Sequence, residues 1–216
     1  MSVLVGKQAP DFTVPAVLGN GEYWRLFTSM FLHADLVHVM MNMLALYSLG
    51  SIMEIAFGHA RYGLIYLLGG LAGSILSASL NEPYIFAVGA SGAVFALFGA
   101  EAAHLYTNWR VMGASAPLRL RQVIMLAVLN FTVGFIGNAT GGGLYNIDNW
   151  AHIGGFAGGA LLAYLIGPRY GVALSADRKQ INVHDARPFS GQIATTIYFG
   201  AGLLAALLFA VLIRST

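Results

Sequence analysis

The segment GASGAVFALFG, residues 89–99, places a serine between two glycines where a long apolar run begins. Farther along the chain, NWAHIGGFAGGALLAY, residues 149–164, places a histidine before a similar run of small residues. On helices, the aligned positions are Ser91, Phe95 and Gly99 in the first segment and His152, Gly155, Gly159 and Ala163 in the second. Helix faces this smooth can pack closely in a membrane, which would bring the serine and the histidine together.

The composition is that of a membrane protein. The 216 residues are 57% hydrophobic and 9% charged, whereas a soluble domain has about 25% charged residues. The 27 glycines suit helices that pack closely in lipid. The absence of cysteine from the sequence excludes disulfides and thiolate chemistry. A net charge of +2 from scattered basic residues does not indicate nucleic-acid binding.

Six stretches are apolar and long enough to be candidate membrane-spanning helices. They are residues 36–56, 62–80, 88–107, 122–138, 150–167 and 193–213. The longest connection between them, residues 168–192, is a charged linker rather than a soluble domain. The sequence therefore predicts an all-α, polytopic membrane helix bundle.

Lysine and arginine are distributed unevenly between the two sets of loops. Eight lie on one side: Arg61, Arg110, Arg119, Arg121, Arg169, Arg178, Lys179 and Arg187. Three lie on the other side, together with both termini: Lys7, Arg25 and Arg214. The positive-inside rule makes the larger set cytoplasmic. The spans that begin near residues 36, 88 and 150 then run inward, so polar residues in their first turns share one depth near the outer surface.

Four polar residues, Ser91, His152, His38 and Asn42, lie at this depth. A serine hydroxyl becomes a nucleophile when a base takes its proton, and a neutral imidazole can be that base. Gly89 would let a substrate backbone approach, and N–H groups at the helix start could stabilise an oxyanion. Each residue also has a structural interpretation, because serine and histidine commonly hydrogen-bond within membrane bundles.

Asp148 precedes His152 by four residues and could orient it as in a triad. However, an aspartate before an apolar helix is more typical of an N-cap, so a serine–histidine dyad is the more economical interpretation. His38 and Asn42 share a helix face, which suits either an oxyanion site or an interhelical hydrogen bond. His33 and His38 are five apart and no HExxH motif occurs, which argues against a metalloprotease.

In their order along the chain, these motifs resemble the rhomboid family of intramembrane serine proteases over about residues 20 to 168. The matching stretches are GEYWRLFTSMFLHADLVHVMMN, GASG and AHIGG. The resemblance implies that Ser91 is the nucleophile and His152 the general base, with His38 and Asn42 at the oxyanion site. It implies supporting roles for His33, Phe95, Gly155, Gly159, Trp24, Arg25 and Glu54.

The resemblance also predicts how the chain is organised. Only 23 residues precede Trp24, so we expect the family's usual first helix to be absent from this chain. An additional C-terminal span matches the six-plus-one arrangement of part of the family. The expected parts are an extracytoplasmic segment and loop over 1–35, the catalytic membrane core over 36–168, a cytoplasmic linker over 169–192 and the additional helix over 193–216.

The implied activity is hydrolysis of peptide bonds in or near transmembrane segments of membrane protein substrates. The implied surroundings are a lipid bilayer, with no nucleic acid, metal or cofactor as partner. Family habit implies a multi-pass protein of the bacterial inner membrane whose site faces the outer leaflet, capped by the Gly-rich loop at 139–146. The alternative is a non-catalytic relative that binds transmembrane clients. A transporter fits less well, because the polar cluster lies in one leaflet rather than at the midplane.

Overall fold

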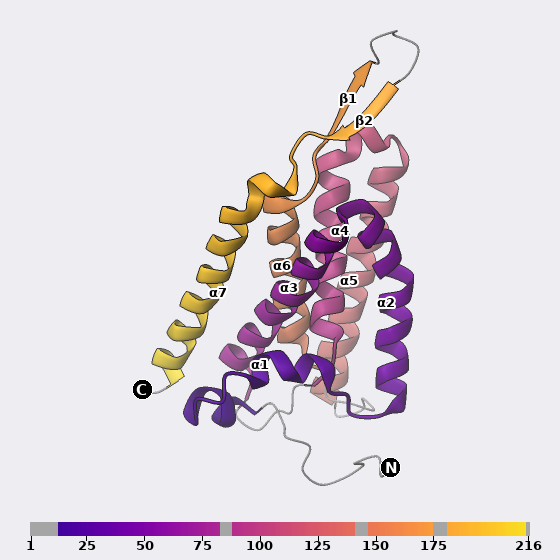
Figure 1. Ribbon diagram of the computed structural model, residues 1–216. Coiled ribbons are helices and arrows are strands. Elements are labelled where there is room, and N and C mark those ends of the chain that lie inside the picture. The colour runs from indigo at the N-terminus through magenta and orange to yellow at the C-terminus, as the bar shows by residue number, and fades with distance from the viewer. Residues whose placement is uncertain (1–12, 83–87, 141–146, 175–180, 215–216) are drawn as a thin grey trace.

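The computed structural model describes residues 13–82, 88–140, 147–174 and 181–214. Its long helices run alternately up and down between two ends (Figure 1). The short helices are η1 (Pro15–Gly19), α1 (Arg25–Thr28), η2 (Ser29–Phe31) and η3 (Phe189–Gln192). The long helices are α2 (Leu36–Phe57), α3 (His59–Leu80), α4 (Ser91–Met112), α5 (Ser115–Thr140), α6 (Asn149–Ile166) and α7 (Ile193–Arg214). The predicted all-α membrane helix bundle is confirmed.

The helices differ in how much lipid they can face. In the described part of the chain, α2, α3, α5 and the stretch Phe189–Arg214 are long and apolar enough to cross a membrane. The central helices α4 and α6 are less apolar because they carry buried polar side chains, among them Glu101, His104 and His152. Such side chains are tolerated in a bundle where they face neighbouring helices instead of lipid.

Helix α6 lies between α3 and α4, and glycines make both contacts possible. A Cβ on Gly155 or on Gly159 would collide with a backbone carbonyl of α4. On the opposite side, a Cβ on Gly73 of α3 would lie 2.5 Å from the carbonyl oxygen of Ala151. The three helices therefore meet backbone to backbone, which fixes their spacing more tightly than side-chain packing would.

Two apolar clusters fill the ends of the bundle. At the end where α4 and α6 begin, Val17 of η1 and Leu26 of α1 pack with Ile75 of α3 and Ala210 of α7. At the other end, residues of α2, α3, α4 and α6 form a second cluster: Leu49, Met53, Phe57, Ile65, Leu97, Ala100, Leu162, Ala163 and Ile166. The polar residues at the start of α4 and α6 thus lie at one end of an apolar interior.

The segment expected as a linker contains a hairpin that composition did not predict. Strands β1 (Tyr170–Leu174) and β2 (Ile181–Asp185) pair antiparallel. Figure 1 shows the hairpin projecting from the end opposite to the first turn of α2. Buried Arg61 of α3 holds it through an ion pair of 2.8 Å with Asp185, and the Tyr170 N–H donates to Oδ1 of Asn108 at 2.8 Å. Tertiary contacts therefore stabilise two strands that the local sequence does not predict.

Some expectations concern residues outside the described ranges. These are the part of the N-terminal segment before residue 13 and the capping loop at 139–146 from residue 141 onward.

Candidate active site

The side chains of Ser91 and His152 meet at the start of two packed helices. Ser91 is the first residue of α4, and His152 lies in the first turn of α6. Oγ of Ser91 lies 2.8 Å from Nε2 of His152, and His152 is 9% exposed. One turn farther, Gly155 allows the backbone of α6 to touch the carbonyl of Gly92. The contact between the two helix backbones thus sets the distance between the two side chains.

Aromatic rings fix the orientation of the His152 imidazole. Phe95 stacks on it with ring centroids 4.3 Å apart and an interplanar angle of 14°. Phe131 of α5 stacks in turn on Phe95, at 5.3 Å and 28°. Nδ1 of His152 is buried and has no hydrogen-bond partner among the described residues. With its hydrogen on Nδ1, the ring presents Nε2 as an acceptor to the serine hydroxyl.

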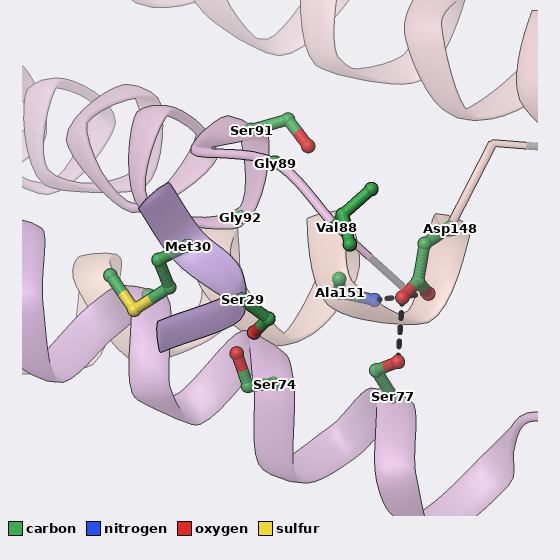
Figure 2. A pocket seen from close by; sticks show the side chains of 11 residues that line it. Ser29, Met30, Ser74, Ser77, Val88, Gly89, Ser91, Gly92, Asp148 and Ala151 are labelled. Atoms are coloured by element: carbon green, nitrogen blue, oxygen red, sulfur yellow. Dashed lines mark hydrogen bonds between the residues drawn. The ribbon is translucent and has the colours of Figure 1, made fainter. Parts of the chain in front are cut away.

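Asp148 caps α6, and its carboxylate makes no described hydrogen bond to the imidazole of His152. Its carboxylate accepts hydrogen bonds from the Ala151 N–H at 2.9 Å, from Oγ of Ser77 at 2.6 Å and from Nδ2 of Asn81 at 2.9 Å. Figure 2 shows the carboxylate turned toward Ala151 and Ser77. The N-cap interpretation is confirmed, and the described hydrogen bond of the His152 ring is the one with Ser91.

Gly89 is required both by its backbone and by its neighbour. Its φ of +129° is unfavourable for any residue with a side chain. A Cβ there would also lie 2.8 Å from Nε2 of His38 and 3.7 Å from Oγ of Ser91. The Gly89 N–H donates to the Ser29 carbonyl at 3.0 Å, which anchors the segment. His38 therefore lies against the backbone that immediately precedes the serine.

Asn42, which is expected at the oxyanion site, lies on α2, and His33, which is expected in a supporting role, lies just before it. Asn42 is 5% exposed, and its amide donates to the carbonyl of His38 at 2.9 Å, within the helix. The His33 ring meets the His38 ring edge-on, with centroids 5.2 Å apart. Burial and the neighbouring His38 lower the pKa of His33, against an opposing effect of a hydrogen bond with the Phe31 backbone. The structure thus brings His38 to the serine segment, while the described hydrogen bond of Asn42 stays within α2.

Three expected supporting residues lie farther out. Trp24 is 61% exposed and precedes α1, and Arg25 forms an ion pair with Glu22. Glu54 lies at the opposite end of the bundle, where its carboxylate is 2.6 Å from Nδ1 of His59. The chain reverses there at Gly58, which has a φ of +75°. Glu54 therefore belongs to the corner between α2 and α3.

A small polar cavity opens beside Ser91 (Figure 2). Its polar walls are the side chains of Ser29, Ser74, Ser77, Ser91 and Asp148. The centre of a water molecule can occupy about 20 Å³ of this cavity. That volume holds about one or two waters. Among the described residues, no group of histidine, cysteine and acidic side chains is arranged to hold a metal ion.

The sequence interpretation missed Ser77, Asn81 and Phe131. The first two are four residues apart at the end of an otherwise apolar span, and this pairing was the available signal. Phe131 is one of two phenylalanines on α5, and nothing in the sequence sets it apart.

The Rhomboid domain family matches residues 20–169. RHOMBOID-like protein 1 of Arabidopsis thaliana is 42% identical over 160 residues, which are 73% of this chain and 39% of that protein. Rhomboid protease GluP of Bacillus subtilis is 36% identical over 152 residues, which are 70% of this chain and 28% of that protein.

The chain thus spans less than half the length of these curated relatives. They come from a plant and a bacterium, so they do not support the expected assignment to a bacterial inner membrane. The family match, together with the apolar helices, shows a multi-pass integral membrane protein. Because the match covers more than half of the residues and the identities are high, the chain belongs to the rhomboid family.

Proposed function

We propose that the chain is an intramembrane serine endopeptidase that cleaves peptide bonds in or near transmembrane segments of membrane proteins. The observation that carries this proposal is the separation of 2.8 Å between Oγ of Ser91 and Nε2 of His152. A hydroxyl hydrogen-bonded to a neutral imidazole is the arrangement that activates a serine nucleophile. Membership of the rhomboid family, which includes a protein named rhomboid protease, supports the same reaction.

The reaction proceeds by acyl transfer. Oγ of Ser91 attacks a backbone carbonyl carbon while Nε2 of His152 takes the hydroxyl proton. The tetrahedral intermediate collapses when His152 returns that proton to the leaving amine nitrogen, which leaves an ester on Ser91. Water then attacks the ester, with His152 again accepting and returning the proton, and the free serine is restored.

The oxyanion needs hydrogen-bond donors on the α2 side of the serine. We assign the Ser91 backbone N–H to it, because the first N–H groups of a helix have no partner within that helix. His38 is a second donor, supported by its position against Gly89. One amide hydrogen of Asn42 is used by the His38 carbonyl, and the other is the donor that we assign to the intermediate.

The membrane placement follows from charge. Among the described residues, six arginines lie toward the hairpin end (Arg61, Arg110, Arg119, Arg121, Arg169 and Arg187) and two toward the other end (Arg25 and Arg214). On the positive-inside rule we assign Ser91 and His152 to the outer leaflet. The proposed core is 36–168, with the additional helix at 193–216 beside it. A substrate helix must unwind locally before cleavage, because helical carbonyls are occupied by hydrogen bonds.

Labelling with a fluorophosphonate probe tests this function. The purified chain is treated with the probe and, separately, incubated in liposomes with a model transmembrane substrate. The wild type should label and cleave, whereas Ser91→Ala should do neither and His152→Ala should lose about 10⁴-fold or more in rate. A wild type that remains folded but neither labels nor cleaves, while it retains the substrate on co-purification, would identify the chain as a non-catalytic binder.

A further inference from the structure

The last residue of α7 is connected to the first turn of α6 by a series of hydrogen bonds. We propose that Arg214 is a positioning residue for His152 and that it acts through Asn81 and Asp148. This inference rests on the proposed function, because it concerns the placement of the general base. None of the residues that connect Arg214 to His152 through hydrogen bonds touches the reacting atoms in the proposed reaction.

The first connection joins α7 to the end of α3. The Arg214 guanidinium donates to the carbonyl of Ser79 at 2.9 Å and to the carbonyl of Asn81 at 2.8 Å. These carbonyls belong to the C-terminal turn of α3, where backbone carbonyls have no hydrogen-bond donor within the helix. A cation is also favoured at that end by the helix dipole. Arg214 thus fixes the position of Asn81, the residue that caps α3.

The second connection joins α3 to the residue that begins α6. Both donor contacts of the Asn81 amide are made inside the protein, to Oγ of Ser77 and to the carboxylate of Asp148, each at 2.9 Å. Ser77 is fully buried and itself donates to Asp148 at 2.6 Å. Because Ser77 and Asn81 are buried, moving Asp148 would leave buried donors without a partner, and the arrangement is held as a unit.

The third connection leads from Asp148 to the base. Its carboxylate accepts from the Ala151 N–H, and its carbonyl accepts from the His152 N–H at 3.2 Å. The carbonyl of Ala151 is pressed against Gly73 of α3, so the first turn of α6 cannot shift without moving α3. A displacement of Asn81 is therefore transmitted to the backbone that carries the imidazole.

Elsewhere, α7 is held mainly by apolar contacts. Leu203, Leu207, Ala210 and Val211 pack on the cluster formed by η1, α1 and α3. Such contacts permit a helix to slide or rotate by small amounts, because they have no directional preference. The hydrogen bonds of Arg214 are directional and define where the end of α7 meets α3. The additional helix thereby contributes to the geometry of the dyad from outside it.

The test compares Arg214→Met with Arg214→Lys in the full chain in liposomes. Methionine keeps the apolar stem and removes the donors, whereas lysine keeps the charge. Arg214→Met should lower kcat and the rate of Ser91 labelling about five-fold with KM unchanged, which is within the range seen for residues coupled to a site through others. It should also speed hydrogen exchange at the Ala151 and His152 amides. Arg214→Lys should restore part of both.

Two controls separate this role from general stability. Arg110→Met removes an exposed arginine at the opposite end, whose guanidinium lies over the Trp109 ring, and should change neither rate nor exchange. Combining Arg214→Met with Asn81→Leu should be no worse than Asn81→Leu alone, because both break one series of contacts. The inference would be overturned if the effects of Arg214→Met and Asn81→Leu multiplied in the double variant. It would also be overturned if Arg214→Met changed KM alone, or if it left hydrogen exchange at the start of α6 unaltered. A wild type without labelling or cleavage would instead refute the proposed function, and the exchange data would still decide whether Arg214 controls α6.

Discussion

Two carboxylates at opposite ends of the bundle show how similar local contacts serve different purposes. Asp148 accepts hydrogen bonds from the Ala151 N–H and from the side chains of Ser77 and Asn81, and it caps α6, the helix that carries His152. Asp185 gathers the N–H groups of Arg169 and Arg187 and the guanidinium of Arg61, and it ties the hairpin to α3. Each carboxylate holds two segments that are distant in the sequence.

The difference between them is the charge of their partners. Asp185 is paired with Arg61, whereas within the described residues Asp148 has neutral donors only. A carboxylate whose charge is not neutralised by an adjacent cation stabilises a positive charge formed nearby. In the proposed reaction, that charge is the imidazolium of His152, one helical turn away. We therefore infer that Asp185 only fastens the hairpin to α3, whereas Asp148 both caps α6 and stabilises the positive charge that the proposed reaction forms on His152.

The largest expected effect separates glycines at the two ends. Gly155→Ala should lower the rate of substrate cleavage about 100-fold, the loss expected when reacting groups are displaced by about 1 Å. Its Cβ would collide with the carbonyl of Gly92 and push α6 away from α4. The rate of fluorophosphonate labelling of Ser91 measures the displacement directly.

Gly63→Ala is the matched control for this substitution. Gly63 lies near the start of α3, at the hairpin end of the bundle, and a Cβ there meets no atom within 4 Å. Alanine should leave activity unchanged and stabilise the helix by about 0.5–1 kcal/mol, measured as a higher Tm. Equal losses of activity in Gly155→Ala and Gly63→Ala would show that the contact between α4 and α6 has no special role.

An intermediate effect separates the two carboxylates. Asp148→Asn preserves the shape of the side chain but removes its charge, so kcat should fall about ten-fold. Asp185→Asn should leave kcat unchanged, since its charge is neutralised by Arg61 far from the dyad. Steady-state cleavage of one transmembrane substrate by both variants makes the comparison. A similar decrease in both would mean that the two carboxylates differ in position and not in purpose.

The smallest effect is expected at the hairpin under acid conditions. Burial raises the pKa of Asp185, but hydrogen bonds from the Arg187 N–H, the Arg61 side chain and the Arg169 N–H outweigh it and lower the pKa below 3.8. The unfolded hairpin therefore binds a proton more readily than the docked one. The stabilisation is complete above the unfolded pKa and is lost as the pH falls through the folded value.

Hydrogen exchange in β1 and β2 between pH 7 and pH 3, corrected for the intrinsic rates, measures this loss. The wild type should become less protected toward pH 3, whereas Asp185→Asn should be weakly protected throughout. If protection in the wild type did not change with pH, the ion pair with Arg61 would not be what holds the hairpin.

The sequence predicted the features that follow from repetition and composition. The small residues at positions 91, 155 and 159 indicated two helix faces able to touch, and the excess of apolar residues indicated the bundle. It did not predict the hairpin, because strands of five residues gain their stability from Arg61 and Asn108, which are distant in the chain. It also missed Asn81 as a partner of Asp148, since a hydrogen bond across 67 positions leaves no local pattern.

The close contact between α4 and α6 also limits how this protein can be redesigned. Where a glycine contacts a carbonyl, there is no side chain whose size or polarity could be changed. The distance between Ser91 and His152 therefore cannot be adjusted by substitutions at this contact. For the proposed protease, we therefore expect changes of substrate preference to be easier to introduce on α2 and α5, many of whose side chains are exposed. An engineer could therefore hold the chemistry constant while varying which segments reach it.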